Sequence, residues 1–329
     1  MDASQFIEDW NSPDTHITVH TSGSTGTPKP IRVEKKRMVA SALMTCDFLS
    51  IKEGDSALLC LSPDYIAGKM MIVRSLVRRL NLTIMEPTGN PLANDDGHYD
   101  LAAMVPMQVF NILSSPHGEE KLNNIRHLII GGGAIHPMLE KKIAMLTNST
   151  WSSYGMTETL SHIALRRING KEASQWYTPF DNVSVKLSTD GCLIINAPAV
   201  CPESVITNDM AEIAPDGRRF KILGRRDNVI CSGGMKIHIE DIEQRIAAYT
   251  NIRFAIGKRK DPRLGEAMVL VTEGNHEQEL RDLCTRILPS ILRPKEYVAT
   301  NHIPMTGTGK PARALINSIC QTTSSFLEV

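Results

Sequence analysis

The sequence predicts an α/β fold, with a large α/β domain over residues 1–225 and a small α+β domain over residues 226–329. Short apolar segments alternate with amphipathic segments along the chain, which is the pattern of alternating strands and helices in α/β proteins. A charged, glycine-rich stretch at residues 220–243 separates two apolar regions and therefore favours a domain boundary. Hydrophobic residues make up 42% of the chain, which is enough for a sizeable core.

Local patterns predict the individual elements. Residues 56–62 are an apolar run of strand length, and residues 68–80 have helical periodicity. Residues 127–135 predict a strand that ends in a glycine turn, and the helix expected at 136–146 has a proline in its first turn. Residues 184–198 predict a β-hairpin. The small domain is expected to contain two helices and two strands, near 239–249, 276–287, 252–257 and 266–272.

Composition and charge argue against several classes of protein. Lys+Arg and Asp+Glu both number 36, so the formal net charge is zero, which is unlike a general nucleic-acid binder. The seven cysteines are scattered without a CxxC pair, which predicts neither a zinc site nor a disulfide framework and fits a cytoplasmic protein. No segment approaches the roughly 20 apolar residues of a membrane span, and the acidic start is unlike a secretory signal.

Residues 21–29, Thr-Ser-Gly-Ser-Thr-Gly-Thr-Pro-Lys, have the composition of a phosphate-binding loop. The glycines allow sharp turns, the hydroxyls and backbone N–H groups can donate to phosphate oxygens, and the lysine adds positive charge. The Walker pattern does not fit, because Gly23 and Gly26 are only three residues apart and Pro30 follows Lys29. For this segment alone, a Ser/Gly turn without a ligand is the alternative.

Four further segments resemble motifs of one family, in that family's order: YGMTE at 154–158, TND at 207–209, GRRD at 224–227 and PMTGTGKPAR at 304–313. Together with the loop at 21–29 they resemble the acyl- and aryl-CoA synthetases of the adenylate-forming superfamily. The resemblance implies a large ATP- and acyl-binding domain, trimmed at its N-terminal side relative to most members, and a small mobile C-terminal domain.

The resemblance also implies the chemistry. An acid would be activated by ATP as an acyl-adenylate and then transferred to coenzyme A. Lys310 and Thr157 would be catalytic, stabilising charge on the carboxylate and the α-phosphate, and Glu158 would ligate Mg²⁺. Residues implied to bind ATP or AMP are Thr21, Ser22, Gly23, Ser24, Thr25, Gly26, Lys29, Gly132, Gly133, Ala134, Tyr154, Gly155, Asp209 and Arg225.

The junction of the two domains has its own motif residues. Asp227 matches the hinge of the family, and Gly233 and Gly234 would line the path of the thiol. A charged loop residue without a hinge role is an equal alternative for Asp227.

Within the family, the chain is most similar to the o-succinylbenzoate–CoA ligases of menaquinone biosynthesis, on residues 61–76 and 154–165. That acid has a second carboxylate, and a buried anion needs a cationic partner. At most one of the two candidate cations is expected to serve, because they do not share an ideal helical face. Candidates for the acyl pocket are Tyr65, which stands where histidine is common in the family, and Lys69, Arg74, Ser161 and His162. For the last four, ordinary surface exposure or packing is the alternative.

The expected partners are a small carboxylic acid, ATP and coenzyme A, with no nucleic acid and no membrane span. Two alternatives stay open. The chain can be an adenylation enzyme for another aryl or acyl acid or for a carrier-protein thiol instead of free coenzyme A, or it can be a non-catalytic nucleotide-binding protein. The sequence also leaves the oligomeric state open, including a homo-oligomer.

Overall fold

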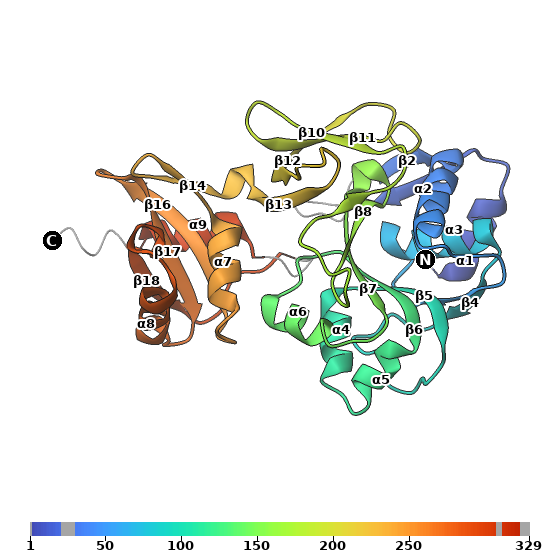
Figure 1. Cartoon of the computed structure of the whole chain (residues 1–329), viewed down its shortest axis with the longest axis horizontal. Helices are drawn as coiled ribbons and strands as arrows, with labels where there is room; N and C mark the ends of the chain where they lie inside the picture. Colours follow the sequence, from blue (N-terminus) through green and yellow to red (C-terminus); the bar gives the residue numbers. More distant parts are fainter. Residues whose placement is uncertain (1, 21–29, 307–310, 323–329) are drawn as a thin grey trace. The chain divides into compact units, whose positions relative to one another are not determined.

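The structure is a computed structural model that describes residues 2–20, 30–306 and 311–322. Figure 1 labels its helices and strands, which form two compact units. Both units combine helices with β-sheets, so the predicted α/β class is confirmed. The first unit comprises Met1–Ile135, Leu139–Thr207 and Ile213–Lys221, and the second comprises His136–Met138, Asn208–Glu212 and Ile222–Val329.

A seven-stranded sheet forms the centre of the first unit, in the order β4-β3-β5-β6-β7-β8-β9. From β4 to β7 the strands are parallel, whereas β8 and β9 are added antiparallel. The strands are β3 (Ser56–Leu59), β4 (Asn81–Ile84), β5 (Tyr99–Met104), β6 (Ile125–Ile130), β7 (Ser149–Gly155), β8 (His162–Arg167) and β9 (Thr178–Pro179).

Helices cover this sheet because its central parallel strands are apolar on both faces. Leu58, Ala102 and Leu128 belong to a core shared with α4, α5 and α6. On the other face, α3 packs against β3, β4 and β5, and α1 and α2 pack against α3. The helices are α1 (Ala3–Asn11), α2 (Lys35–Phe48), α3 (Ile66–Arg78), α4 (Pro106–Leu113), α5 (Gly118–Asn123) and α6 (Pro137–Ile143).

Two smaller sheets accompany the large one. Strands β1 (His16–His20) and β2 (Pro30–Glu34) form an antiparallel hairpin. The predicted hairpin at 184–198 is confirmed as β10 (Ser184–Leu187) and β11 (Cys192–Asn196). These strands continue into a four-stranded sheet with β12 (Val205–Ile213) and β13 (Phe220–Arg225). Short 3₁₀ turns lie at Thr157–Thr159, Arg226–Asn228 and Ser290–Leu292.

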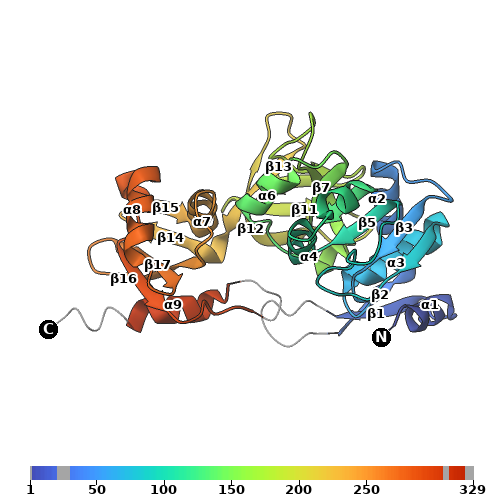
Figure 2. The ribbon, with the colours of Figure 1, turned by 90° about the horizontal axis from the view of Figure 1, so that it is seen from below.

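The second unit is a sheet with helices on both faces. Alternate residues of β17 separate two cores: Met268 and Leu270 pack with α7 and α8, whereas Val269 and Val271 pack with α9. Figure 2 shows α9 lying along this sheet. The elements are β14 (Val229–Ser232), β15 (Met235–His238), α7 (Ile239–Ala247), β16 (Phe254–Asp261), β17 (Gly265–Glu273), α8 (Glu277–Ile287), β18 (Glu296–Thr300) and α9 (Arg313–Thr322).

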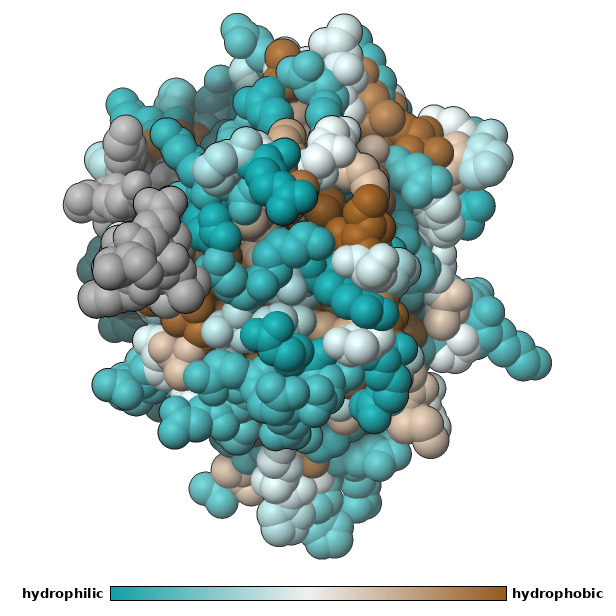
Figure 3. All heavy atoms as spheres, turned by 90° about the vertical axis from the view of Figure 1, so that its left-hand side faces the viewer, coloured by the Kyte–Doolittle hydropathy of each residue, from teal (hydrophilic) through white to brown (hydrophobic). Residues whose placement is uncertain are grey.

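Within the described ranges, every helix is too short or too polar to cross a bilayer. The face drawn in Figure 3 is largely hydrophilic, with apolar residues in small separate patches. Single exposed side chains such as Tyr249 and Ile291 are ordinary on protein surfaces.

Candidate functional site

A glycine turn follows the carboxyl end of β6. Gly132 has φ +81°, a conformation that side chains disfavour, and a Cβ on Gly131 would lie 2.3 Å from Ser153 Oγ. Gly133 and Ala134 are exposed, so the turn presents backbone to solvent. The carboxyl ends of parallel strands form the usual ligand-binding edge of an open α/β sheet. The turn therefore has the location and exposure that a nucleotide site needs.

The YGMTE segment lies at the same edge, where β7 turns into β8. The hairpin register shifts between Tyr154 and Gly155, and a Cβ on Gly155 would lie 2.3 Å from the Ser161 carbonyl oxygen. The chain then forms the 3₁₀ turn at Thr157–Thr159, in which Glu158 is exposed. Glycine is thus required at position 155, where the two strands approach each other closely. In the turn that follows, the exposed Glu158 carboxylate is available to a ligand.

Tyr154 belongs to an aromatic group that the sequence did not reveal. The centre of its ring lies 5.2 Å from that of Phe220 and 5.8 Å from that of Tyr177. Tyr177 and Phe220 stack on each other, and the hydroxyls of Tyr177 and Ser152 are 2.9 Å apart. These contacts fix the orientation of the Tyr154 ring near the carboxyl end of β7. The partners are distant in sequence, so only the fold identifies them.

Arg74, on α3, is a buried cation. It is 2% exposed, donates to Ser161 Oγ at 2.9 Å and contacts Met71 Sδ at 3.7 Å. Within the described part of the chain, its Nε has no hydrogen-bond partner and no carboxylate pairs with the guanidinium. Burial lowers the pKa of Arg74 to about 10. A buried cation without a counterion is unfavourable, so this position fits an anionic ligand group.

His162 and Thr45 complete what we call the Arg74 cluster: Arg74, Ser161, His162 and Thr45. His162 Nε2 lies 3.0 Å from Thr45 Oγ1, and its Nδ1 lies 3.4 Å from Ser161 Oγ. Desolvation, and then the nearby Arg74 charge, lower the pKa of His162 well below its usual value, so the imidazole is neutral at pH 7. Thr45 was not predicted, because a threonine inside a helix carries no ligand signal in sequence.

Two other predicted pocket residues lie apart from the Arg74 cluster. Lys69 is also 2% exposed, but its Nζ donates to the Pro63 carbonyl and lies 5.6 Å from the centre of the Phe6 ring. Tyr65 precedes α3 and is 60% exposed. The structure therefore brings together Arg74, Ser161 and His162, and it directs Lys69 toward α1.

Asp209 and Arg225 are brought together in the second unit. Arg225 Nη1 lies 3.7 Å from Asp209 Oδ1, and its Nη2 lies 3.4 Å from Asp227 Oδ2. The neighbouring Arg226 donates to Asn208 Oδ1 at 2.7 Å. The TND and GRRD motifs, which are separate in sequence, therefore form one polar group that contains both carboxylates and guanidinium groups.

Gly233 and Gly234 form the turn between β14 and β15. Their φ angles are +57° and +83°, and the Gly233 N–H donates to the Leu264 carbonyl at 2.9 Å. Both glycines are exposed. Side chains disfavour two consecutive residues with positive φ, so this turn leaves a surface without side chains.

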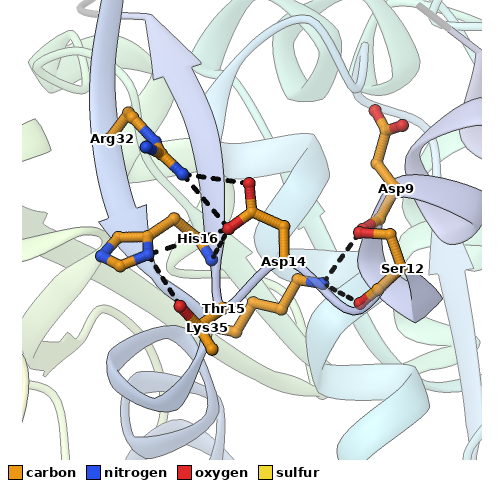
Figure 4. A network of polar contacts seen from close by, with 7 residues as sticks. All are labelled: Asp9, Ser12, Asp14, Thr15, His16, Arg32 and Lys35. Carbon is orange, nitrogen blue, oxygen red and sulfur yellow. Dashed lines mark hydrogen bonds and ion pairs between the residues drawn. The ribbon is translucent and has the colours of Figure 1, made fainter.

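The base of the β1–β2 hairpin is held by a polar network, drawn in Figure 4. Arg32 donates to both carboxylate oxygens of Asp14, at 3.1 and 3.0 Å, and the His16 N–H donates to the same carboxylate at 2.9 Å. Lys35 Nζ donates to the Ser12 carbonyl at 2.8 Å. The hairpin pairs as far as His20 and Pro30. The predicted phosphate-binding residues between them lie outside the described residues: Thr21, Ser22, Gly23, Ser24, Thr25, Gly26 and Lys29.

Lys310 also lies outside the described residues, but both ends of its segment are described. Met305 and Pro311 form an antiparallel bridge, and the Ala312 N–H donates to the Pro304 carbonyl at 2.8 Å. The described residues on the two sides of Lys310 therefore lie next to each other.

The predicted Mg²⁺ site depends on which oxygen donors surround Glu158. No group of three or more His, Cys, Asp or Glu side chains with metal-binding geometry occurs among the described residues. Mg²⁺ usually binds one or two carboxylates together with substrate phosphates and water, so the exposed Glu158 carboxylate fits such a site.

A separate hollow of about 620 Å³ lies at the opposite, amino ends of β6 and β7. Its lining includes Arg126, His127 and Trp151 and none of the predicted site residues. Burial lowers the pKa of His127 to about 4. The predicted motifs therefore collect at one end of the strands, and this hollow lies at the other.

Comparison with known proteins identifies the class. Residues 3–193 match the family described as AMP-binding enzyme, and the chain therefore belongs to that family. The expected resemblance to the adenylate-forming superfamily, and the expected enzyme class, are confirmed. Membership supports ATP binding, and the finer cofactor assignments stay predictions.

Particular relatives narrow the comparison. The 2-succinylbenzoate–CoA ligase of Listeria innocua is 26% identical over 92% of this chain and 70% of its own length. A solved acyl-CoA synthetase (AMP-forming)/AMP-acid ligase II-like protein from Dyadobacter fermentans is 38% identical, with a TM-score of 0.66, over 95% of this chain and 92% of that one. The o-succinylbenzoate CoA synthetase from Bacillus subtilis in complex with its acyl-adenylate is 19% identical, with a TM-score of 0.76, over 91% of this chain and 68% of that one; this match supports the fold alone.

Proposed function

We propose that this chain is an AMP-forming acid–CoA ligase that acts on o-succinylbenzoate or a closely similar aryl diacid. Membership of the AMP-binding enzymes supports the nucleotide chemistry. The relative from Listeria innocua supports the choice of acid. The single observation that carries the substrate proposal is the buried Arg74, which has no carboxylate partner among the described residues and lies beside Ser161 and His162.

In the first half-reaction, a carboxylate oxygen of the acid attacks the α-phosphorus of ATP. A new O–P bond forms, and pyrophosphate leaves with the electrons of the broken bond. Negative charge grows on phosphate oxygens, so fixed cations and donors lower the barrier. We assign Lys310 and Thr157 to the carboxylate and the α-phosphate, and the residues of the 21–29 loop to the other phosphates. Glu158 would hold Mg²⁺, which offsets phosphate charge when bound.

The nucleoside would be held at the carboxyl edge of the large sheet and by the TND and GRRD motifs. Gly132, Gly133 and Ala134 expose backbone for the adenine, and Tyr154 supplies an aromatic face beside them. Asp209 would accept hydrogen bonds from the ribose hydroxyls, with Arg225 beside it.

In the second half-reaction, the thiol of coenzyme A attacks the acyl carbonyl carbon. The thiol loses its proton to solvent, a C–S bond forms, the bond between the acyl carbon and the phosphate oxygen breaks, and AMP leaves with the electrons of that bond, so that the product is an acyl-CoA thioester. We propose that residues 226–329 move relative to residues 1–225 between the two steps, with Asp227 at the hinge. The side-chain-free turn at Gly233 and Gly234 suits the passage of the thiol.

The second carboxylate of the acid would pair with Arg74. The guanidinium already donates to Ser161, and its Nε is available for a further acceptor. The neutral His162 adds a polar wall without a second positive charge. A charge-assisted hydrogen bond in such a buried position is stronger than one in water, so the pocket would favour diacids over monoacids.

Acid-dependent AMP formation tests the proposal. The purified chain is given ATP, Mg²⁺, coenzyme A and a panel of carboxylic acids that includes o-succinylbenzoate. We expect AMP and pyrophosphate with the diacid, and consumption of free coenzyme A. AMP formation without consumption of free coenzyme A would favour a carrier-protein thiol, and nucleotide binding without AMP would favour a non-catalytic protein.

A variant separates the two half-reactions. Lys310→Ala should nearly abolish adenylate formation, because the lysine charge is needed while pyrophosphate leaves. Thioester formation from supplied acyl-adenylate should stay close to that of the parent chain. Equal loss in both steps would contradict the two-step assignment.

A cytoplasmic location is part of the proposal. None of the seven cysteines, all of which are described, forms a disulfide, which suits a reducing compartment.

A further inference from the structure

A partly buried ion pair includes Arg313, three residues after Lys310 in the sequence. Arg313, the first residue of α9, donates through Nη1 to Glu243 Oε1 at 2.7 Å and through Nη2 to Glu243 Oε2. The two side chains are only 18% and 19% exposed. This two-point geometry fixes both the distance and the orientation of the groups.

The pair also forms hydrogen bonds with the backbone of β16. The Ile256 N–H donates to Glu243 Oε1 at 2.7 Å, and Arg313 Nη1 donates to the Ile256 carbonyl at 2.8 Å. One carboxylate and one guanidinium thus join α7, β16 and the start of α9. Because the hydrogen bonds form a closed ring, Arg313 cannot shift without breaking several of them.

The other side of α9 leaves little freedom for adjustment. The Lys258 N–H donates to Asn317 Oδ1 at 3.0 Å. A Cβ on Gly257 would lie 2.5 Å from Cys320 Sγ, so helix and strand are in close contact there. The helix that follows the lysine loop is therefore fixed at its first residue and along its length.

The ends of the lysine loop are joined to this fixed point. The Ala312 N–H bonds to the Pro304 carbonyl at 2.8 Å, and Met305 bridges to Pro311. Arg313 is the next residue along the chain. Lys310 lies outside the described residues, and the Glu243–Arg313 pair holds the described chain three residues after it.

We propose that Glu243 and Arg313 are positioning residues for Lys310 in adenylate formation. This inference rests on the proposed function. Neither residue touches the acid or ATP in this proposal; the pair acts by holding the loop base from which the lysine reaches the reacting atoms. A displacement of about 1 Å at a reacting group can lower a rate by roughly 100-fold. Loss of the pair should therefore slow the step that uses the lysine far more than the step that does not.

The second unit offers a matched control. Arg259 Nε donates to Glu296 Oε1 at 3.0 Å, and these side chains are 14% and 21% exposed. This pair also joins elements of the same sheet, β16 and β18, but it makes no contact with the lysine-loop base among the described residues. Glu243→Gln and Glu296→Gln each remove one carboxylate charge from a similarly buried pair.

The experiment measures both half-reactions in full-length wild type, Glu243→Gln and Glu296→Gln. Adenylate formation is followed by pyrophosphate release in a single turnover with o-succinylbenzoate, and thioester formation by coenzyme A consumption from supplied o-succinylbenzoyl-adenylate. We expect Glu243→Gln to lower adenylate formation by roughly 100-fold and to leave thioester formation within about threefold. Glu296→Gln should leave the ratio of the two rates unchanged.

Other outcomes decide against the inference. Equal losses in both half-reactions of Glu243→Gln, or the same rate ratio in both variants, would assign the pair a structural role only. If Glu243→Gln does not fold, Arg313→Lys is measured in the same way, because it keeps the charge and removes the two-point geometry; failure of both to fold also assigns a structural role. A wild type that forms no adenylate with any acid refutes the proposed function instead.

Discussion

One charged pair lies in the hairpin that carries residues 21–29 and another lies close to Lys310 in the sequence, and the surroundings of the two pairs differ. The Asp14–Arg32 pair, at the base of the hairpin that carries residues 21–29, has side chains 54% and 65% exposed. The Arg313–Glu243 pair, at the base of the loop that carries Lys310, has side chains 18% and 19% exposed. Water and salt compete with the first pair, whereas the second acts in a medium of lower effective dielectric constant.

The difference indicates how each loop is anchored. The β1–β2 hairpin has a second source of stability, because its own side chains Ile17, Val19 and Val33 are buried. The helix α9 also has apolar anchors, because Ile316 and Cys320 are buried against β17, and its first residue is held in addition by the ion pair. We infer that apolar burial anchors both the β1–β2 hairpin and α9, and that the better shielded ion pair adds a stronger charged anchor at the start of α9.

The largest effect is expected at the buried pair. Arg313→Ala would leave the Glu243 carboxylate partly buried without its partner, and should lower the free energy of unfolding by about 3–5 kcal/mol. Urea unfolding checks this value. The double variant Glu243→Ala/Arg313→Ala should lose less than the sum of the single variants. A loss below about 1 kcal/mol in Arg313→Ala would place this pair with ordinary surface pairs.

Arg74 differs from the arginines of both ion pairs, because it is buried and has no carboxylate partner among the described residues. Arg74→Met should raise KM for o-succinylbenzoate by roughly 100-fold, the value of one strong charge-assisted hydrogen bond, and change KM for a comparable monoacid little. Thermal stability should stay equal or increase, because a buried charge is removed. Arg74→Lys, which keeps a charge, is the control. Equal changes in KM for both acids would remove Arg74 from the acyl pocket.

His162 of the Arg74 cluster should make the stability of the chain depend on pH. The pKa of His162 is lowered in the folded chain, so the unfolded chain binds more protons in acid. The contribution of His162 to stability is therefore complete above about pH 6.5 and is lost as the pH falls toward the folded pKa. Urea unfolding between about pH 7.5 and 4.5 should show a shallower acid decline in His162→Gln than in wild type. A parallel decline in both would show that His162 is not shielded from protons.

The smallest effect is expected at the exposed pair. The His16 N–H, and then the Arg32 charge, lower the pKa of Asp14, but the carboxylate is in contact with water. Asp14→Asn keeps most of the hydrogen bonding and should shift Tm by no more than about 2 °C. Added salt should reduce even this shift, whereas the effect of Arg313→Ala should be largely insensitive to salt. A large shift in Asp14→Asn would mean that the hairpin depends on its charges.

The order of elements could be predicted well from local patterns. The helix expected at 68–80 is α3 (Ile66–Arg78), and the one expected at 276–287 is α8 (Glu277–Ile287). The helix expected at 136–146 is shorter, ending at Ile143. Apolar periodicity identifies such elements because each buries one face, but it does not define where the last turn ends.

The predicted site was harder to assemble from sequence. Lys69 and Arg74 were equal candidates for the pocket cation, and both prove to be buried. Their directions differ: Arg74 meets Ser161, whereas Lys69 meets the Pro63 carbonyl and the Phe6 ring. Side-chain direction depends on packing against elements distant in the chain, which spacing within one helix does not contain.

The sequence by itself determined the alternation of strands and helices, the glycines that positive φ angles and close approaches require, and the ordered motifs of an AMP-binding enzyme, because these depend on local chain stereochemistry and residue type. Only the tertiary structure decided which charges are buried and which groups meet. Ser161 lies 87 residues from Arg74, and Arg313 lies 70 residues from Glu243. Whether such charges act strongly depends on how much water the packed chain excludes around them, and no short stretch of sequence carries that information.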